Sequence, residues 1–273
     1  MTYRFTILGC GSSPGVPRPN GDWGACDPSE PRNRRTRASM LVERIGSEGR
    51  TRVVIDTGPD FREQCIRNSV DRLDAVVLTH AHADHIHGID DIRTFVLTSK
   101  RRMPVYADEH TYQRLYEGFG YCFEKPAGSD YPPICEHRTI AHDTSFAVEG
   151  PGGPIMFEPL VQQHGAIRSL GFRIGALAYC SDVSAIPEKT AARMNDLDVL
   201  IIDALQYREH PSHFSVAQAT EFSRSVNPGR TVLTHMHTPL DYRALRAELP
   251  ETIEPAYDGM AIELLGPGAA DVP

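Results

Sequence analysis

Four side chains that can bind a metal ion occur within six residues of this chain, in the segment His80-Ala81-His82-Ala83-Asp84-His85. Imidazole nitrogens and carboxylate oxygens are ligands of Zn²⁺, and a larger share of carboxylate also suits Mn²⁺ or Fe²⁺. On an extended backbone His80 and His82 point to the same side, while Asp84 and His85 turn toward a second position. The spacing therefore predicts one short loop that serves two metal ions.

Two metal ions need more ligands than one loop supplies, and three further candidates share a position just beyond a predicted strand. These are His164 after the strand 155–160, Asp182 after 176–180 and His235 after 231–234. Sites in layered α/β proteins gather at the carboxyl ends of strands. A lone histidine there is more often a surface or core residue, but the three together favour a metal centre.

Apolar runs and helix-start patterns predict the elements that position these residues. The predicted strands are 3–8, 38–45, 52–56, 75–79, 155–160, 170–174, 176–180, 199–203, 231–234 and 260–265, and the predicted helices are 60–68, 109–117 and 215–226. Capping-box patterns at Asp60–Glu63 and Ser215–Gln218 predict two of the helix starts. Residues 118–153, rich in Pro and Gly, are expected to be irregular. No linker divides the chain, so we expect a single α/β (α+β) domain over residues 1–273.

Composition excludes several classes of protein. The chain of 273 residues is 40% hydrophobic and 23% charged, which is typical of globular domains. Its net charge of −8 argues against a general binder of nucleic acid or membrane surfaces, and no apolar run is long enough for a transmembrane helix. The six cysteines form no CxxC pair, so reduced thiols are expected, and the absence of a signal-peptide pattern predicts a cytoplasmic protein.

The order of the motifs resembles the metallo-β-lactamase fold superfamily over nearly the whole chain, beginning with Asp56 in Asp56-Thr57-Gly58. The resemblance implies a four-layer αβ/βα sandwich, with two mixed β-sheets face to face and helices outside. It also implies two divalent ions per chain, Zn²⁺ and/or Mn²⁺. The implied ligands are His80, His82 and His164 for the first ion, Asp84, His85 and His235 for the second, and Asp182 as the bridging carboxylate. Asp56 resembles the residue that steadies the metal loop from behind.

Within that superfamily, residues 8–15, 234–237 and 257–260 resemble metal-dependent phosphodiesterases, namely those that open phosphoribosyl 1,2-cyclic phosphate and, more distantly, tRNase Z. His213, just before the predicted helix 215–226, matches a histidine that contacts the scissile phosphate and assists the leaving group in both. Asp84 is expected to hold the attacking hydroxide, which the two metal ions share. The resemblance implies hydrolysis of a small or cyclic phosphodiester, nucleotide-like or sugar-phosphate-like.

Three other functions remain open at this point. A tRNA 3′-processing endonuclease is disfavoured because the net charge is −8 and no long basic arm is present, so nucleic acid is not the expected partner. A metal-binding accessory protein of cofactor biosynthesis would use the same ligands without hydrolysis. A thioesterase is a minor alternative. Dimers are common among the relatives, so a homodimer is the assembly to consider, and no membrane partner is expected.

The chain departs from the cyclic-phosphodiesterase pattern at one place. The loop that follows the opening glycine motif holds only Cys26, and His237 follows His235 too closely to match the usual additional ligand. We therefore expect no separate structural zinc. The role of His237 stays open, as does that of the basic cluster 32–37, which either recognises an anion or is a solvated loop.

Overall fold

A computed structural model describes residues 1–266, which form two compact units and two seven-stranded sheets. Unit 1 comprises Met1–Thr6, Ser39–Met156 and the described residues from Ala261 onward, and unit 2 comprises Ile7–Ala38 and Phe157–Met260. The chain thus begins in unit 1, forms a long N-terminal segment of unit 2 over Ile7–Ala38, and continues in unit 1 from Ser39.

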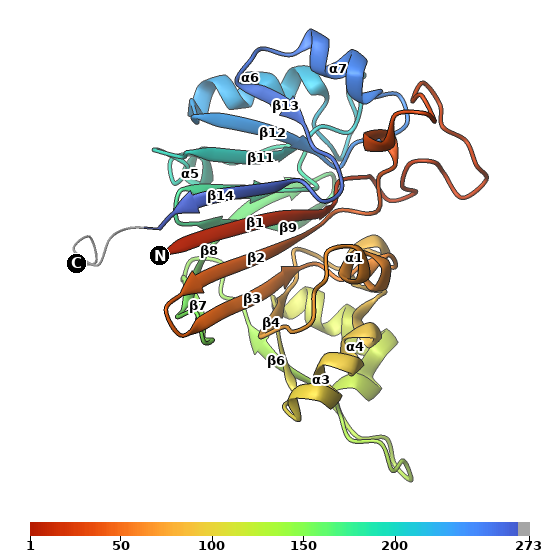
Figure 1. The fold of residues 1–273 in the computed structure, drawn as a ribbon, viewed down its shortest axis with the longest axis vertical. Coiled ribbons are helices and arrows are strands. Elements are labelled where there is room, and N and C mark those ends of the chain that lie inside the picture. Colours follow the sequence, from red (N-terminus) through yellow and green to blue (C-terminus); the bar gives the residue numbers. More distant parts are fainter. Residues whose placement is uncertain (267–273) are drawn as a thin grey trace. The chain divides into compact units, whose positions relative to one another are not determined.

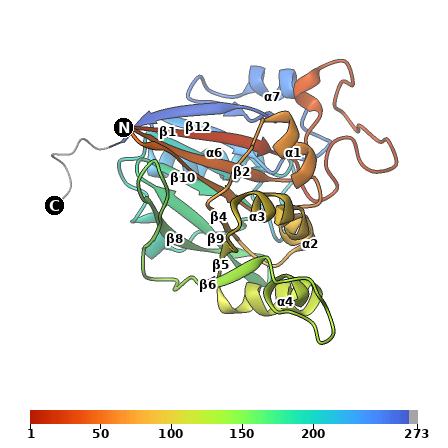
Figure 2. The same cartoon turned by 60° about the horizontal axis from the view of Figure 1, so that its bottom comes forward.

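The sheet of unit 1 has the strand order β14-β1-β2-β3-β4-β5-β6. Its strands are β1 (Thr2–Gly9), β2 (Ser39–Gly46), β3 (Gly49–Ile55), β4 (Ala75–Val77), β5 (Met103–Ala107), β6 (Cys135–Thr139) and β14 (Ala261–Leu265). The sheet is mixed, because β2 and β3 pair antiparallel whereas β3 to β6 run parallel. The helices α1 (Phe61–Arg67), α3 (Arg93–Ser99) and α4 (Glu109–Phe123) lie together beside it in both views, and Figure 2 shows α2 (Ala83–Ile86) next to α3 (Figures 1 and 2). Two 3₁₀ turns are η1 (Pro31–Asn33), in unit 2, and η2 (Ile89–Ile92).

The second sheet has the order β13-β12-β11-β10-β9-β8-β7 and is also mixed. Its strands are β7 (Phe146–Val148), β8 (Ile155–His164), β9 (Ile167–Ile174), β10 (Leu177–Cys180), β11 (Val199–Asp203), β12 (Arg230–Thr234) and β13 (Ile253–Pro255). The strand β11 has the sequence VLIID and is buried throughout, as expected for a parallel strand between two neighbours. Helix α6 (Val216–Val226) packs on β11 and β12, and α7 (Tyr242–Glu248) packs on β13, while α5 (Glu188–Ala191) is a single turn (Figure 1).

The two predicted capping boxes had different outcomes. At α6 the box is confirmed, because the Ser215 hydroxyl accepts from the Gln218 backbone and the Gln218 side chain accepts from the Ser215 backbone. At α1 it is wrong, because Asp60 itself adopts helical backbone angles and its side chain makes no capping bond. A residue inside the helical region cannot reach back as a cap residue does.

The predicted irregular segment 118–153 is also wrong in part. Helix α4 continues to Phe123, and β6 and β7 follow within the same segment. The sequence of β6, CEHRT, places one buried residue before four that are partly or fully exposed, so it shows no apolar alternation. Short edge strands of this kind carry little periodic signal.

Two composition-based expectations can be compared with the structure. All six cysteines are free and buried, as the reduced-thiol prediction requires. Every helix within residues 1–266 is too short or too polar to cross a lipid bilayer.

Gly88 joins α2 to η2 and provides a stability test of the loop that carries the predicted ligands. A Cβ atom at this position would lie 2.1 Å from the Gly58 carbonyl oxygen, and the Gly88 amide donates to the Thr57 carbonyl at 2.8 Å. Gly88→Ala is therefore expected to cost about 2 kcal/mol or more, as overpacking against backbone does. Urea unfolding measures this change. Gly118→Ala in α4 is the control, since nothing lies within 4 Å of its Cβ position and stability should not fall.

Candidate metal centre

Three predicted site residues have a left-handed backbone conformation. Asp56 (φ 64°) follows β3, Asp182 (φ 52°) lies two residues after β10, and His235 (φ 56°) follows β12. They are three of the seven non-glycine residues with positive φ in the described range. Such angles are disfavoured and cluster at functional sites, where the surrounding fold enforces them. At each of these strand ends, the surrounding fold therefore holds a predicted site residue in a disfavoured backbone conformation.

In unit 1, Asp56 connects the end of β3 to the predicted metal loop. Its Oδ1 accepts from the Thr79 amide at 2.8 Å, and its Oδ2 accepts from the Thr79 hydroxyl at 2.8 Å. The same Oδ2 lies 2.7 Å from Nδ1 of His85, and both residues are fully buried. Burial raises the pKa of Asp56, while His85 and Thr79 oppose that shift. With Nδ1 donating to the carboxylate, His85 presents Nε2 as its ligand atom.

The other predicted ligands of unit 1 lie beside this pair. His80 follows β4 and is buried, with Nδ1 3.0 Å from the Thr79 hydroxyl and Nε2 3.0 Å from Nδ1 of the exposed His82. Asp84, in the first turn of α2, has Oδ2 3.4 Å from Nε2 of His85. The turn at 80–85 therefore brings imidazole and carboxylate donors together at the end of β4.

In unit 2, strand ends bring together His164, Asp182 and His235. His164 is the last residue of β8, which runs four residues beyond the predicted strand end. The Oδ1 atom of Asp182 lies 3.2 Å from Nε2 of His235 and 3.8 Å from Nε2 of His164, and all three residues are buried. The His164 Nδ1 lies 2.6 Å from the Ser212 carbonyl, which fixes its ring. The predicted ligands of this unit thus converge on one carboxylate oxygen.

His213 belongs to the same cluster. One ligand atom each of His164, Asp182 and His213 lie within 4.8 Å of one another. The His213 ring is 4.7 Å from the His235 ring, nearly parallel at 13°, and 4.7 Å from that of His164. It lies three residues before the start of α6 and is buried. The turn before α6 therefore places His213 inside the buried cluster and not on the surface.

Asp203 is a site residue that the sequence reasoning missed. It ends β11 and is fully buried, with Oδ2 2.7 Å from Nδ1 of His213 and 2.9 Å from the Val183 amide, which donates to it. Its Oδ1 lies 3.9 Å from Nδ1 of His235. Burial raises the pKa of Asp203, and the two histidines oppose the shift. A sequence signal for Asp203 was present, because it is the last residue of the predicted strand 199–203. The other candidates lie just beyond the ends of predicted strands.

The donor set of unit 2 fits a divalent cation. Two carboxylates and three imidazoles are buried side by side, and buried charges are costly unless an opposite charge or a metal compensates them. Nitrogen and carboxylate donors suit Zn²⁺ or Mn²⁺ and are unlike the all-oxygen sets of Ca²⁺. The unit 1 donors have the same chemistry.

The side chains whose roles were left open serve the N-terminal loop of unit 2. His237 has Nδ1 2.9 Å from the Ser12 hydroxyl and Nε2 2.7 Å from Arg18. Burial lowers the pKa of His237, and the positive charge of Arg18 lowers it further. The Cys26 thiol donates to the Thr238 and Leu240 carbonyls at 3.4 Å each. The cluster 32–37 is not one patch, because Arg32 pairs with Glu30 while Arg35 is buried.

Asp258 anchors the same loop, and its substitution should weaken unit 2. Its Oδ1 accepts from the Cys10 amide at 3.1 Å, and its Oδ2 accepts from the Thr36 amide and hydroxyl at 2.8 and 2.7 Å. Removing a half-buried charged acceptor of hydrogen bonds costs about 1.5–3 kcal/mol, so we expect a loss of that size for Asp258→Ala in urea unfolding. Unchanged stability would mean that the loop is held elsewhere.

The pH dependence of Asp258 has a definite sign. Burial raises its pKa to about 6 against 3.8 for the unperturbed group. A raised carboxyl pKa means that folding takes up a proton, so its favourable contribution is complete below about pH 4 and is lost as the pH rises through about 6. The amount by which the free energy of unfolding of the wild type exceeds that of Asp258→Asn should therefore be larger at about pH 5 than at about pH 8. An equal difference at both pH values would contradict the raised pKa.

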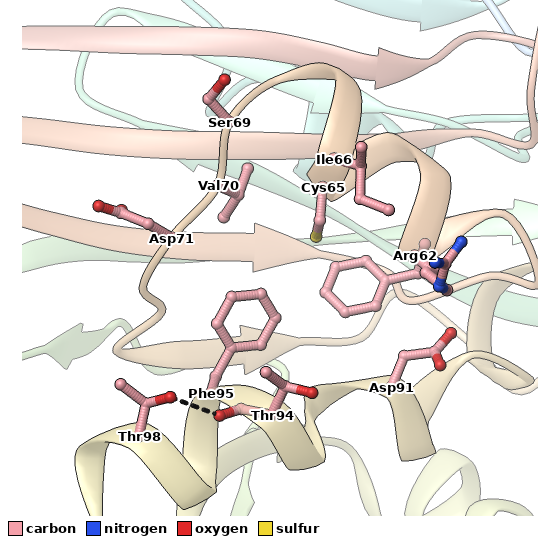
Figure 3. Close-up of a pocket in the computed structure, with 11 residues that line it drawn as sticks. Arg62, Cys65, Ile66, Ser69, Val70, Asp71, Asp91, Thr94, Phe95 and Thr98 are labelled. Atoms are coloured by element: carbon pink, nitrogen blue, oxygen red, sulfur yellow. Dashed lines mark hydrogen bonds between the residues drawn. The ribbon is translucent and has the colours of Figure 1, made fainter.

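A cleft of about 530 Å³ between α1 and α3 of unit 1 is separate from these residues. Figure 3 shows the Phe95 ring and the Cys65 sulfur directed into it, with Arg62 and Asp91 at one end. Burial and the nearby Asp91 raise the pKa of Cys65 to about 12, so its thiol is protonated at neutral pH and is a poor nucleophile. The lining of this cleft gives no reason to place chemistry there.

Comparison with known proteins shows the family. A family model described as a beta-lactamase superfamily domain matches residues 51–236. The chain belongs to the β-lactamase superfamily. The resemblance and the predicted sandwich fold class are thereby confirmed. A crystal structure of a diphosphatase from the PhnP family is 34% identical, with a TM-score of 0.86 over 97% of this chain and 98% of that one.

Two curated relatives carry other names. An octanoyltransferase of Porphyromonas gingivalis is 34% identical over 262 residues, which cover 94% of this chain and 51% of that protein. The chain thus spans about half the length of that relative. A ribonuclease Z of Bradyrhizobium diazoefficiens is 25% identical over 288 residues, covering 81% of this chain and 90% of the relative. Superfamily membership and the His/Asp clusters indicate a metal-dependent hydrolase that binds divalent metal.

Proposed function

We propose that this chain is a phosphodiesterase that hydrolyses a small or cyclic phosphodiester at a centre of two divalent ions. The observation that carries the proposal is the buried His213–Asp203 pair beside the donor atoms of His164 and Asp182. A phosphodiester releases a poor alkoxide leaving group, which needs a proton in the transition state. A thioester releases a far better thiolate, so a thioesterase has less use for such a histidine.

The proposed ligands are those expected from the sequence. His80, His82 and His164 would hold one ion, Asp84, His85 and His235 the other, and Asp182 both. Bound divalent ions supply Lewis-acid stabilisation of the phosphoryl oxygens and a water of lowered pKa. The donor chemistry within each unit supports this assignment, and Zn²⁺ or Mn²⁺ are the ions that it favours.

The chain's own residues supply orientation and proton movement. Asp56 keeps the proton of His85 on Nδ1, so that Nε2 is available as a ligand atom. Asp84 would accept a hydrogen bond from the attacking water. His213, with Nδ1 bound to Asp203, would donate a proton from Nε2 to the leaving oxygen, and the Asp203 carboxylate would stabilise the imidazolium that carries it.

The relatives bear on the choice of substrate. The diphosphatase of 34% identity favours a small phosphorylated substrate and adds a diphosphate linkage to the candidates. The ribonuclease Z relative supports the tRNA-processing alternative, against which the net charge of −8 stands. The name octanoyltransferase belongs to a protein about twice as long as the matching region and gives no reason to assign acyl transfer here.

The experiment is hydrolysis of bis-p-nitrophenyl phosphate by protein whose metal content has been measured, with Zn²⁺ or Mn²⁺ added. About two ions per chain with metal-dependent turnover are expected. Two ions without turnover would shift the assignment to a thioesterase or a metal-binding accessory protein, and one ion or none would contradict the dinuclear centre. Salt-dependent binding of tRNA is the separate test of the endonuclease alternative.

A further inference from the structure

A long loop of unit 2, residues 17–36, is fastened to the segment that follows His235. The Ala25 amide donates to the Thr238 carbonyl at 3.0 Å, and Asn33 donates to the Asp241 carboxylate at 2.6 Å. Gly24 has φ +56°, and a Cβ atom there would lie 2.7 Å from Cβ of Thr238. The loop is therefore fastened, within the same unit, to residues that begin three positions after the predicted metal ligand His235.

The only tryptophan of the chain, Trp23, lies on this loop. Its ring is half-buried, and the guanidinium carbon of the exposed Arg34 lies 5.4 Å from the ring centroid, within cation–π range. The Trp23 carbonyl accepts from the Cys26 amide at 3.0 Å, which closes the turn that carries it. A flat aromatic side chain and a cation are thus held together on a loop that is fastened to the segment following β12.

We propose that Trp23 and Arg34 bind the nucleobase of a nucleotide substrate, so that Trp23 determines specificity by stacking. The proposal rests on the proposed phosphodiesterase function and adds the substrate class to it. An indole face stacks on any base, and an arginine beside it adds a cation for the base or its phosphate. An aliphatic alcohol or simple sugar offers no such planar surface.

The charge of the loop favours a nucleotide of small size over RNA. Residues 17–36 contain four arginines, Arg18, Arg32, Arg34 and Arg35, against three acids, Asp22, Asp27 and Glu30, so the net charge is 4 − 3 = +1. Arg18 pairs with Asp22 at 2.8 Å, Arg32 pairs with Glu30 at 2.7 Å, and Arg35 is buried. A surface that follows an RNA backbone needs an extended row of available cations, which this loop does not provide.

Binding can be tested without turnover, because fluorescence excited selectively at tryptophan, outside the tyrosine absorption band, comes from Trp23 alone. The metal-loaded full chain is titrated with adenosine 5′-monophosphate and with ribose 5-phosphate, which has the same phosphate and no base. Saturable quenching by the nucleotide, at concentrations at least about fivefold lower than any effect of ribose 5-phosphate, is expected. Equal effects of the two would overturn the proposal, as would quenching by an RNA oligonucleotide alone.

Kinetics provides the second arm, with thymidine 5′-(p-nitrophenyl phosphate) compared with methyl p-nitrophenyl phosphate. The two esters share a leaving group and differ by the nucleoside. Trp23→Ala should reduce the ratio of their kcat/KM values about tenfold, mainly through KM, and Trp23→Phe should keep most of it. Tyr131→Ala, at an exposed tyrosine of unit 1, is the control and should leave the ratio unchanged.

The outcomes of this arm separate the two proposals. If Trp23→Ala slows both esters equally, the tryptophan only stabilises its loop and the specificity proposal is wrong. If neither ester is hydrolysed although the nucleotide quenches fluorescence, the phosphodiesterase proposal fails while nucleobase binding stands.

Discussion

Asp182→Ala is expected to reduce kcat/KM for bis-p-nitrophenyl phosphate by about a thousandfold or more, with loss of bound metal. The Asp182 carboxylate is buried at a strand end, with one oxygen 3.2 Å from His235 and 3.8 Å from His164. If Asp182 serves both ions as proposed, its removal takes away a shared ligand and leaves buried imidazoles without the carboxylate charge. An effect of this size is in line with the share of catalysis that metal ions and positioned charge supply. Metal analysis of the variant and steady-state kinetics measure both changes.

The control for this substitution is Asp196→Ala. Asp196 is also an aspartate of unit 2 with positive φ, at 56°, but its side chain is exposed on a turn. Removing it imposes the same backbone change without touching the cluster, so metal content and turnover should stay at wild-type levels. Full metal content and turnover in Asp182→Ala would exclude Asp182 from the centre.

The strand ends explain why so much of the candidate site was predictable from the sequence. Parallel and mixed sheets place their ligands where a buried apolar run stops, so Asp182 and His235 were found from local pattern alone. Asp203 occupies an equivalent place at the end of β11 and was missed, although the strand-end pattern that identified Asp182 marks Asp203 equally. Only its contact with His213 reveals its role, and that contact joins residues brought together by the turn before α6.

The fold was less predictable where order does not depend on apolar periodicity. Helix α3 and the edge strands β6 and β7 were not predicted, because short elements with mixed exposure have weak patterns. Strand β5 was also not predicted, although its buried and half-buried residues alternate. The 17–36 loop, although polar and rich in proline and glycine, is held by specific contacts such as Cys26 to Thr238 and Asn33 to Asp241. These contacts span more than 200 positions along the chain, and no local rule reports them.

Asp203→Asn is the second substitution with a large expected effect, and its size should depend on the leaving group. The carboxylate binds Nδ1 of His213 at 2.7 Å and would stabilise the imidazolium that donates to the leaving oxygen. An amide carries no charge and cannot do this, so kcat should fall by about 10²- to 10³-fold for a substrate with an alkoxide leaving group, such as a 2′,3′-cyclic nucleotide. The fall should be only a few-fold for p-nitrophenyl esters, because nitrophenolate leaves without a proton.

Two further measurements decide between proton transfer and a purely structural role for Asp203. If Asp203 supports proton transfer, His213→Ala shows the same dependence on the leaving group as Asp203→Asn. The variant that carries both substitutions is then no slower than either single variant, because the two residues act as one unit. If Asp203 is purely structural, Asp203→Asn disturbs the neighbouring His235, whose Nδ1 lies 3.9 Å from the Asp203 carboxylate, and the variant loses metal. Hydrolysis of both substrate classes then slows equally. The exposed Asp198, just before the same strand, supplies Asp198→Asn as the control that should change neither quantity. Equal slowing of both substrates with metal retained would remove proton donation through His213 from the mechanism, since only a step that involves the leaving oxygen distinguishes an alkoxide from nitrophenolate.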